Sequence, residues 1–123
     1  MEATPQNNEP PPINVARLCD TFGDDPEFMA EMYGLYLSDA GQRLTELDAA
    51  LGTSDTEKIA SVAHTLKGTS GNVGAERMSA LAAELEQVDS AQAPQKAQDL
   101  ATALKAEFEA VRAFLKHYVH SPL

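Results

Sequence analysis

Hydrophobic residues recur at spacings of three and four along most of the chain, which is the period of a helix with one buried face. Four long stretches show this pattern, over about residues 26–51, 54–74 and 75–90 and from residue 94 onward. A shorter stretch runs from Asn14 to residue 21 or 22. Because short turns join the long helices, they should alternate in direction. The sequence therefore predicts an all-α fold: an antiparallel up-down four-helix bundle with a short additional N-terminal helix packed across one end.

The residues expected in the core of this bundle are the ones that carry the helical period, because a helix of this length is stable only when its apolar stripe is buried. They are Met29, Tyr33, Leu37, Ala40, Leu44, Leu47, Leu51, Ile59, Val62, Ala63, Leu66, Val73, Met78, Leu81, Ala82, Leu85, Val88, Ala97, Leu100, Leu104, Phe108, Val111, Leu115 and Tyr118.

Capping residues mark several helix ends. Asp25 followed by Pro26 supplies an N-cap and a first-turn proline for the first long helix. Gly52 is the expected stop for the same helix. Ser54 and Glu57 have the spacing of a capping box that would open the next helix. These signals set the expected boundaries of the helices.

The length of 123 residues is enough for one domain of ordinary size. Residues 1–12 contain four prolines among polar residues, and we expect them to form a disordered tail. The helical bundle should occupy residues 13–120.

Composition narrows the classes of partner. The chain has 19 acidic and 9 basic residues and a formal net charge of −10, which disfavours nucleic acid and anionic membranes. Its single cysteine, Cys19, excludes an internal disulfide and a cysteine-based zinc site. The first residues lack the basic and apolar regions of a signal peptide, and no stretch has the roughly 18 apolar residues of a membrane span. We expect a cytoplasmic protein.

His64 lies on the polar side of the third stretch. With about 100° per residue, Val62 and Leu66 fall about 160° away from it on either side, so the apolar stripe points away from the imidazole. Gly68 lies one turn after His64, where glycine costs about 1 kcal/mol relative to alanine. The missing side chain would leave space above the ring. The pattern predicts an imidazole that another protein or a phosphoryl group can reach.

Two charged residues could support such a group. Lys67, three residues after His64, could partly neutralise a phosphoryl group, which carries roughly −1.5 to −2 charge by analogy with phosphoserine. Glu86 lies about as far after the expected helix reversal at Gly74 as His64 lies before it. A carboxylate there could accept the Nδ1 proton and leave Nε2 as the nucleophile.

The segment 63–75, AHTLKGTSGNVGA, resembles the signature of histidine phosphotransfer (HPt) domains. That signature is a His, then Lys-Gly at +3 and +4, a run of small residues, an apolar residue and a Gly at +10. The helical layout of residues 13–118 is also similar to the family. The resemblance therefore covers nearly the whole predicted domain.

The resemblance implies that His64 accepts a phosphoryl group from the aspartate of a receiver domain and donates it to another in a two-component phosphorelay. It assigns supporting roles to Lys67 and Gly68 and a structural role to Gly74. Glu86 is similar in position to the Glu that binds the imidazole in the phosphotransfer domain of chemotaxis kinases, although many family members have Gln there. Partners would be receiver domains of response regulators or hybrid sensor histidine kinases.

By the same resemblance the chain is a phosphocarrier and not an enzyme, since no ATP-binding domain is apparent. It needs no cofactor and no metal of its own, and any Mg²⁺ would belong to the receiver. A carrier with a two-way transfer site is easiest to use as a monomer.

Other assignments remain open. Phe28, Met32 and Leu35 form a second apolar stripe, for which burial under the first helix is slightly favoured over docking of a receiver. Ser61 and Gly71 are further candidates for the docking surface, although Gly71 also suits a turn.

The alternative function is that of a bundle that only docks a partner, as an adaptor without phosphotransfer. A bundle metalloenzyme is disfavoured because the chain has neither a Glu-x-x-His nor a His-x-x-x-His pair. His117 and His120 suit solvated positions at a helix end.

Overall fold

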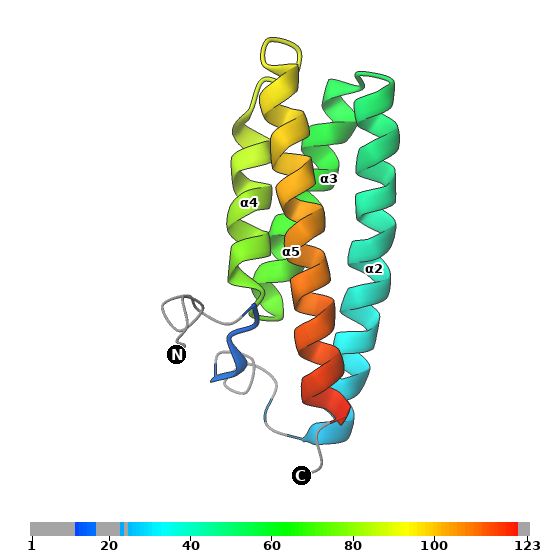
Figure 1. The fold of residues 1–123 in the computed structure, drawn as a ribbon, viewed down its shortest axis with the longest axis vertical. Coiled ribbons are helices and arrows are strands. Elements are labelled where there is room, and N and C mark those ends of the chain that lie inside the picture. Colours follow the sequence, from blue (N-terminus) through cyan, green and yellow to red (C-terminus); the bar gives the residue numbers. More distant parts are fainter. Residues whose placement is uncertain (1–11, 17–22, 24, 121–123) are drawn as a thin grey trace, which may run out of the picture.

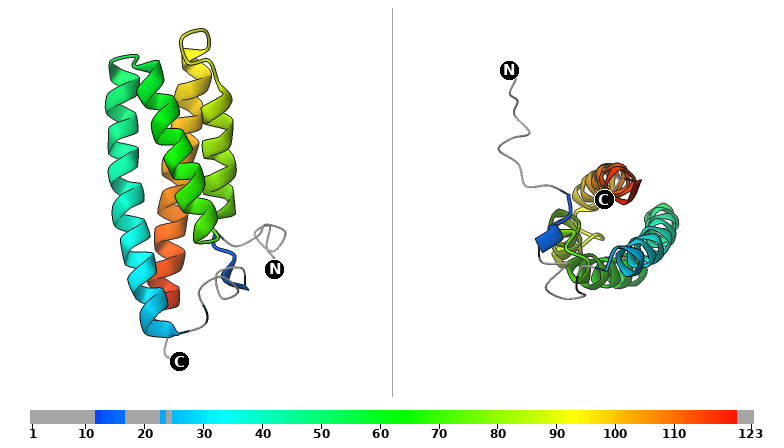
Figure 2. Two further views of the ribbon diagram at one scale, coloured as in Figure 1. Left: turned by 180° about the vertical axis from the view of Figure 1, so that it is seen from behind. Right: turned by 90° about the horizontal axis from the view of Figure 1, so that it is seen from below.

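The computed structural model describes residues 12–16, 23 and 25–120, and of residues 117–120 only the backbone. This part of the chain forms four helices: α2 (Pro26–Gly52), α3 (Thr56–Asn72), α4 (Glu76–Gln87) and α5 (Pro94–His120). Figures 1 and 2 show them side by side, each running opposite to the one before it. The predicted all-α antiparallel bundle is confirmed. None of the described helices is long and apolar enough to cross a membrane.

The start of α2 follows the predicted capping. Asp25 has extended backbone angles, and its Oδ1 accepts hydrogen bonds from the backbone N–H groups of Glu27 at 3.0 Å and Phe28 at 3.4 Å. Pro26 has no N–H to satisfy in the first turn. These contacts satisfy donors that have no partner within the helix.

The predicted capping box between α2 and α3 is wrong. Asp55, not Ser54, is the N-cap of α3, and its Oδ1 accepts a hydrogen bond from the backbone N–H of Lys58 at 3.1 Å. Ser54 instead adopts a left-handed conformation with φ of 56°. Since an N-cap needs an extended backbone, Ser54 cannot fill that place.

The stop expected at Gly52 is also displaced. Gly52 is the last helical residue and Thr53 is the C-cap. The final carbonyl groups of α2 are satisfied by backbone N–H groups: that of Ser54 donates to Leu51 at 3.2 Å and that of Asp55 to Ala50 at 2.9 Å. The chain reversal that makes these bonds requires the left-handed residue at position 54, two residues after the glycine.

The turn from α3 to α4 is shaped by Gly74, whose φ is +80°. A Cβ atom at this position would lie 2.8 Å from the backbone oxygen of Asn14. The Gly74 carbonyl accepts a hydrogen bond from the Asn14 N–H at 2.8 Å, and Ile13 beside it is fully buried. Gly74 is therefore a structural residue that docks the N-terminal segment against this turn.

The predicted N-terminal helix is described only at residues 15 and 16, which are helical. The rest of that prediction, including Cys19, lies outside the described residues, as does the predicted tail up to residue 11. The fourth helix ends at Gln87, three residues before the predicted end. Val88 is extended, and Asp89 Oδ1 accepts from the backbone N–H groups of Ala91 and Gln92, which favours a turn over another helical residue.

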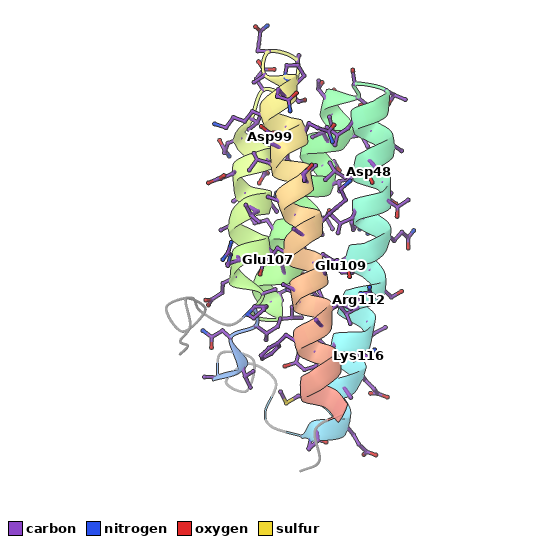
Figure 3. The ribbon with its side chains drawn as sticks, in the orientation of Figure 1. Asp48, Asp99, Glu107, Glu109, Arg112 and Lys116 are labelled. Atoms are coloured by element: carbon purple, nitrogen blue, oxygen red, sulfur yellow. The ribbon has the colours of Figure 1, made fainter. Side chains whose placement is uncertain are left out.

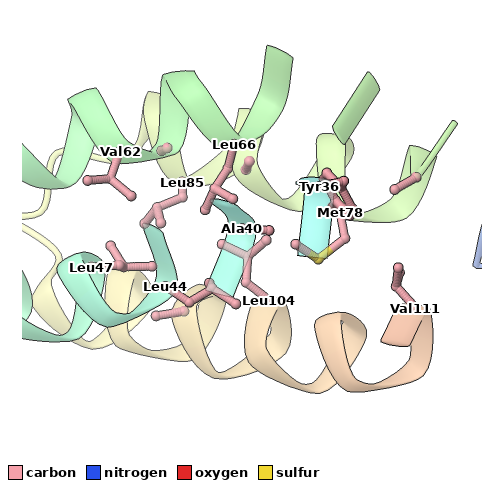
Figure 4. Packing of buried hydrophobic residues seen from close by; sticks show 14 of the residues in the cluster. Tyr36, Ala40, Leu44, Leu47, Val62, Leu66, Met78, Leu85, Leu104 and Val111 are labelled. Atoms are coloured by element: carbon pink, nitrogen blue, oxygen red, sulfur yellow. The ribbon is translucent and has the colours of Figure 1, made fainter. Parts of the chain in front are cut away.

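The core lies between the four helices (Figure 4). Most of the predicted positions are buried, and the others are partly buried against them. The partly buried ones are Leu37, Leu51, Leu81, Val88 and Phe108, while the side chain of Tyr118 lies outside the description. Charged side chains cover the outer surface, including those along α5 in Figure 3. Exposed ion pairs such as that of Lys105 and Asp48, 3.0 Å apart, stabilise a fold by only about 0–1 kcal/mol.

Two buried residues that the apolar pattern did not include tie α2 to α3. The Tyr36 hydroxyl and Ser70 Oγ are 2.8 Å apart and form a hydrogen bond, with Tyr36 4% and Ser70 0% exposed. Burial raises the pKa of the Tyr36 hydroxyl to about 12, although the contact with Ser70 acts in the opposite direction. The phenol therefore stays protonated and able to donate.

Ser70→Ala should lower the free energy of unfolding by about 1–3 kcal/mol, because it leaves the Tyr36 hydroxyl buried without this partner. Combining it with Tyr36→Phe should recover part of the loss, since the stranded hydroxyl is then removed. Urea unfolding of the two single variants and the double variant measures this. Additive losses would contradict the coupling.

Candidate functional site

His64 lies on the outward face of α3. Its side chain is 66% exposed, whereas Val62, Ala63 and Leu66 beside it in sequence are buried in the core. The helical wheel placed it correctly because the direction of the apolar stripe fixes the direction of the opposite face. The imidazole is therefore open to a second molecule.

Glu86 of α4 holds the ring from one side. Its Oε2 is 2.8 Å from His64 Nδ1. An ionised carboxylate can only accept a hydrogen bond, so Nδ1 carries the proton and donates it. Nε2 is then left with its lone pair. The contact that the sequence suggested for Glu86 is present, and it favours one tautomer of the neutral imidazole.

The other oxygen of the same carboxylate faces Lys67. Lys67 Nζ lies 3.0 Å from Glu86 Oε1, an atom that is itself buried, and the two form an ion pair without the alignment of a hydrogen bond. The contacts with Lys67, and after it with His64, hold the pKa of the Glu86 carboxyl below its usual 4.5, outweighing partial desolvation. One carboxylate thus contacts both the imidazole of His64 and the ammonium of Lys67.

The site has open space where a side chain would normally stand. A Cβ atom at Gly68 would meet no atom of the described residues within 4 Å, so their packing does not require glycine there. Helical side chains lean toward the N-terminus, so any larger residue at Gly68 would extend back toward His64. The glycine keeps this approach to the imidazole clear.

Ser79 is a contributor that sequence reasoning missed. Its Oγ donates a hydrogen bond to the backbone oxygen of Lys67 at 2.9 Å, and a Cβ at Gly71 would lie 3.5 Å from the same Oγ. Ser79 precedes Glu86 by seven residues, so both lie on one face of α4. The seven-residue spacing between Ser79 and Glu86 is the sequence feature that could have pointed to Ser79. Gly71 lies beside this contact, where a Cβ would be at ordinary van der Waals distance from Ser79 Oγ.

The second apolar stripe of α2 is more exposed than predicted. Phe28 is 39% exposed and Leu35 is 68% exposed, so the preference for burial was wrong for both, while Met32 is partly buried. The described N-terminal segment, residues 12–16, docks at the α3–α4 turn instead of over this stripe.

A shallow groove lies beside this stripe, between α2 and the C-terminal half of α3. Its lining residues are Met32, Leu35, Tyr36, Asp39, Thr69, Asn72 and Val73. Asn72 follows His64 by eight residues, or about 12 Å along the helix. Ser61 is exposed three residues before His64, on the N-terminal side and away from the groove.

The described residues contain no group of three or more His, Cys, Asp or Glu side chains placed to hold a metal ion. The side chains of His117 and His120 lie outside the description.

Residues 31–114 match the family of the Hpt domain. The chain belongs to this family. The structure is also similar to the crystal structure of histidine-containing phosphotransfer protein B (HptB) from Pseudomonas aeruginosa PAO1, with a TM-score of 0.82 and 26% identity over 92% of this chain and 98% of that one. No curated protein matches the sequence significantly.

As a member of this family, the Hpt domain has a histidine phosphotransfer role in a phosphorelay. Its partners belong to the receiver domains and histidine kinases. Hpt proteins are phosphocarriers and not kinases. The family resemblance seen in the sequence is confirmed.

In this Hpt domain the Glu86 carboxyl should titrate below pH 4.5, because Lys67 and His64 favour its ionised form. A pKa lowered by folding adds stability that is complete above 4.5 and is lost as the pH falls through the lowered value. NMR titration of the carboxyl carbon measures this. Lys67→Met should move the pKa back toward 4.5 by more than His64→Gln does, and the reverse order would contradict the assignment.

Proposed function

We propose that His64 is the phosphorylated residue and that the chain carries the phosphoryl group between receiver aspartates. The observation that supports this most directly is the 2.8 Å contact of Nδ1 with Glu86 on a ring that is 66% exposed. With Nδ1 donating to Glu86, Nε2 of the neutral ring would be the nitrogen that attacks a partner's phosphoryl group. A surface histidine without such a contact has no fixed tautomer.

In the loading step, the Nε2 lone pair attacks the phosphorus of an aspartyl phosphate. The bond from phosphorus to the aspartate oxygen breaks, and its electron pair leaves with the aspartate carboxylate. Nδ1 keeps its proton, so the phosphorylated ring is positive and lies beside the Glu86 carboxylate. In the unloading step an aspartate oxygen attacks the same phosphorus, and the electron pair of the P–N bond returns to Nε2. Neither step requires a proton to move.

Lys67 and Gly68 have supporting roles in this proposal. The Lys67 ammonium lies within one helical turn of His64 and brings positive charge to an incoming phosphoryl group. Gly68 leaves room for that group and for the receiver backbone that delivers it, since no atom of the described residues lies within 4 Å of where its Cβ would stand.

The receiver would dock along the groove between α2 and α3. Leu35, Met32 and Phe28 give this region exposed apolar area, and Leu35 is the most exposed large apolar side chain among the described residues. The buried core of a protein interface is more apolar than its rim, and Leu35 would lie in that core. Ser61, before His64 on α3, and Gly71, beside α4, lie outside the groove and would be reached only by a receiver that also covers the imidazole.

His64→Gln should abolish phosphorylation, because the amide has no nucleophilic ring nitrogen, while leaving receiver binding intact. The test incubates each protein with a phosphorylated receiver domain and measures acid-labile label. Label on the wild type alone supports the proposal. Label on both proteins would show that the phosphorylated residue is not His64. If both proteins bind several receivers and neither becomes labelled, the result would favour an adaptor that only docks.

Leu35→Asp should slow transfer from a phosphorylated receiver roughly tenfold at low receiver concentration, because it places a charge in the apolar contact. Direct phosphorylation by phosphoramidate, a small donor that needs no docking, should be unchanged. Ala49→Asp, an exposed position near the other end of α2, is the matched control. Equal effects of the two substitutions would contradict docking at Leu35.

A further inference from the structure

The Glu86 carboxylate is shared between two residues of α3. Oε2 accepts the hydrogen bond from His64 Nδ1 at 2.8 Å, while Oε1 faces Lys67 Nζ at 3.0 Å. The positive charge of Lys67 is therefore already balanced before any phosphoryl group arrives. A role for Lys67 in holding that group requires the lysine to give up part of its contact with Glu86.

A phosphoryl group on Nε2 changes the balance of charge around this lysine. It adds roughly −1.5 to −2 charge by analogy with other phosphorylated side chains. It also sits across the ring from Glu86, because Nδ1 and Nε2 point to opposite sides of the imidazole. Two anions then compete for one ammonium, and the phosphoryl group carries the larger charge.

Lys67 has the freedom to move between them, and Glu86 does not. The lysine side chain is 40% exposed and ends a flexible four-carbon stem, so its ammonium can turn toward Nε2 without a change in α3. The Glu86 side chain is only 22% exposed and stays bonded to Nδ1, which keeps its proton in the loaded state.

We propose that Glu86 holds Lys67 in the unloaded carrier and that phosphorylation of His64 transfers the Lys67 ammonium from Glu86 Oε1 to a phosphoryl oxygen. The inference rests on the proposed function of His64 and adds a positioning role for Glu86 toward the lysine. Because Lys67 gives up one contact to make the other, it stabilises the loaded state less than a free lysine would. The phosphoryl group is then held loosely enough to be passed on.

The test is a double-mutant cycle on the phosphorylation equilibrium. Phosphoramidate is the donor, so that His64 gains the phosphoryl group and ammonia leaves, and ³¹P NMR measures the ratio of phosphorylated to free protein at fixed ammonia. Lys67→Met should lower this ratio in the wild type, and by roughly two- to fivefold more in the Glu86→Gln background, the range expected for an exposed ion pair. Glutamine keeps an acceptor for Nδ1 but releases the lysine.

Glu84→Gln is the matched control, since it removes an equal charge from an exposed position two residues away on α4. Lys67→Met should have the same effect in that background as in the wild type. Lys67→Arg should keep the ratio of phosphorylated to free protein close to that of the wild type, because arginine retains the positive charge. An equal effect of Lys67→Met in the wild-type and Glu86→Gln backgrounds would overturn the inference while leaving the proposed function intact.

A direct observation of the lysine completes the test. The Nζ resonance of Lys67 should shift on phosphorylation of the wild type, and Glu86→Gln should shift it already in the unloaded protein. A resonance that phosphorylation leaves unmoved would overturn the transfer of the ammonium. If wild-type protein acquires no phosphohistidine from phosphoramidate or from a receiver, the proposed function fails, and this inference fails with it.

Discussion

The close antiparallel packing of α3 against α4 is the constraint on which the site depends. The buried side chains of Leu66 on α3 and Leu85 on α4 hold the two helices together, and the Ser79 hydroxyl fixes their approach at the Lys67 backbone. Glu86 follows Ser79 by seven residues on the same face, which carries its carboxylate to the level of His64. No single contact around the imidazole would form without this register.

The same packing explains how a histidine can be both fixed and exposed. Burial of the apolar stripe orients α3 and sends His64 outward, so no part of the core has to cover the ring. Orientation comes instead from one carboxylate on the neighbouring helix. The Lys67 partner of Glu86 is partly exposed and flexible, so the proposed exchange of its contact would leave the fold intact. This is the property that a reversible carrier requires.

The sequence predicted most of the bundle because its dominant signal is local. Apolar spacing located four helices to within a few residues, and Asp25 with Pro26 marked a helix start that the structure confirms. The prediction was wrong where two adjacent residues have similar N-cap propensities and the backbone geometry decides between them. Ser54 and Asp55 both suit an N-cap, and the hydrogen bonds that close α2 force the left-handed angle onto Ser54. Exposure of Leu35 could not be read from spacing either, since a second apolar stripe fits burial and docking equally well.

By itself, the sequence determined the helices, the outward direction of His64, the glycine that leaves its ring open and the resemblance to the Hpt family. These follow from the helical period and from a motif that lies within one helix. Only the tertiary structure decided that Glu86 meets both His64 and Lys67, that Ser79 sets the approach of the two helices, and that Tyr36 and Ser70 join in the core. The reason is physical: a helix fixes the angular order of its own side chains, but the rotation and axial offset between two helices arise from how their side chains pack together.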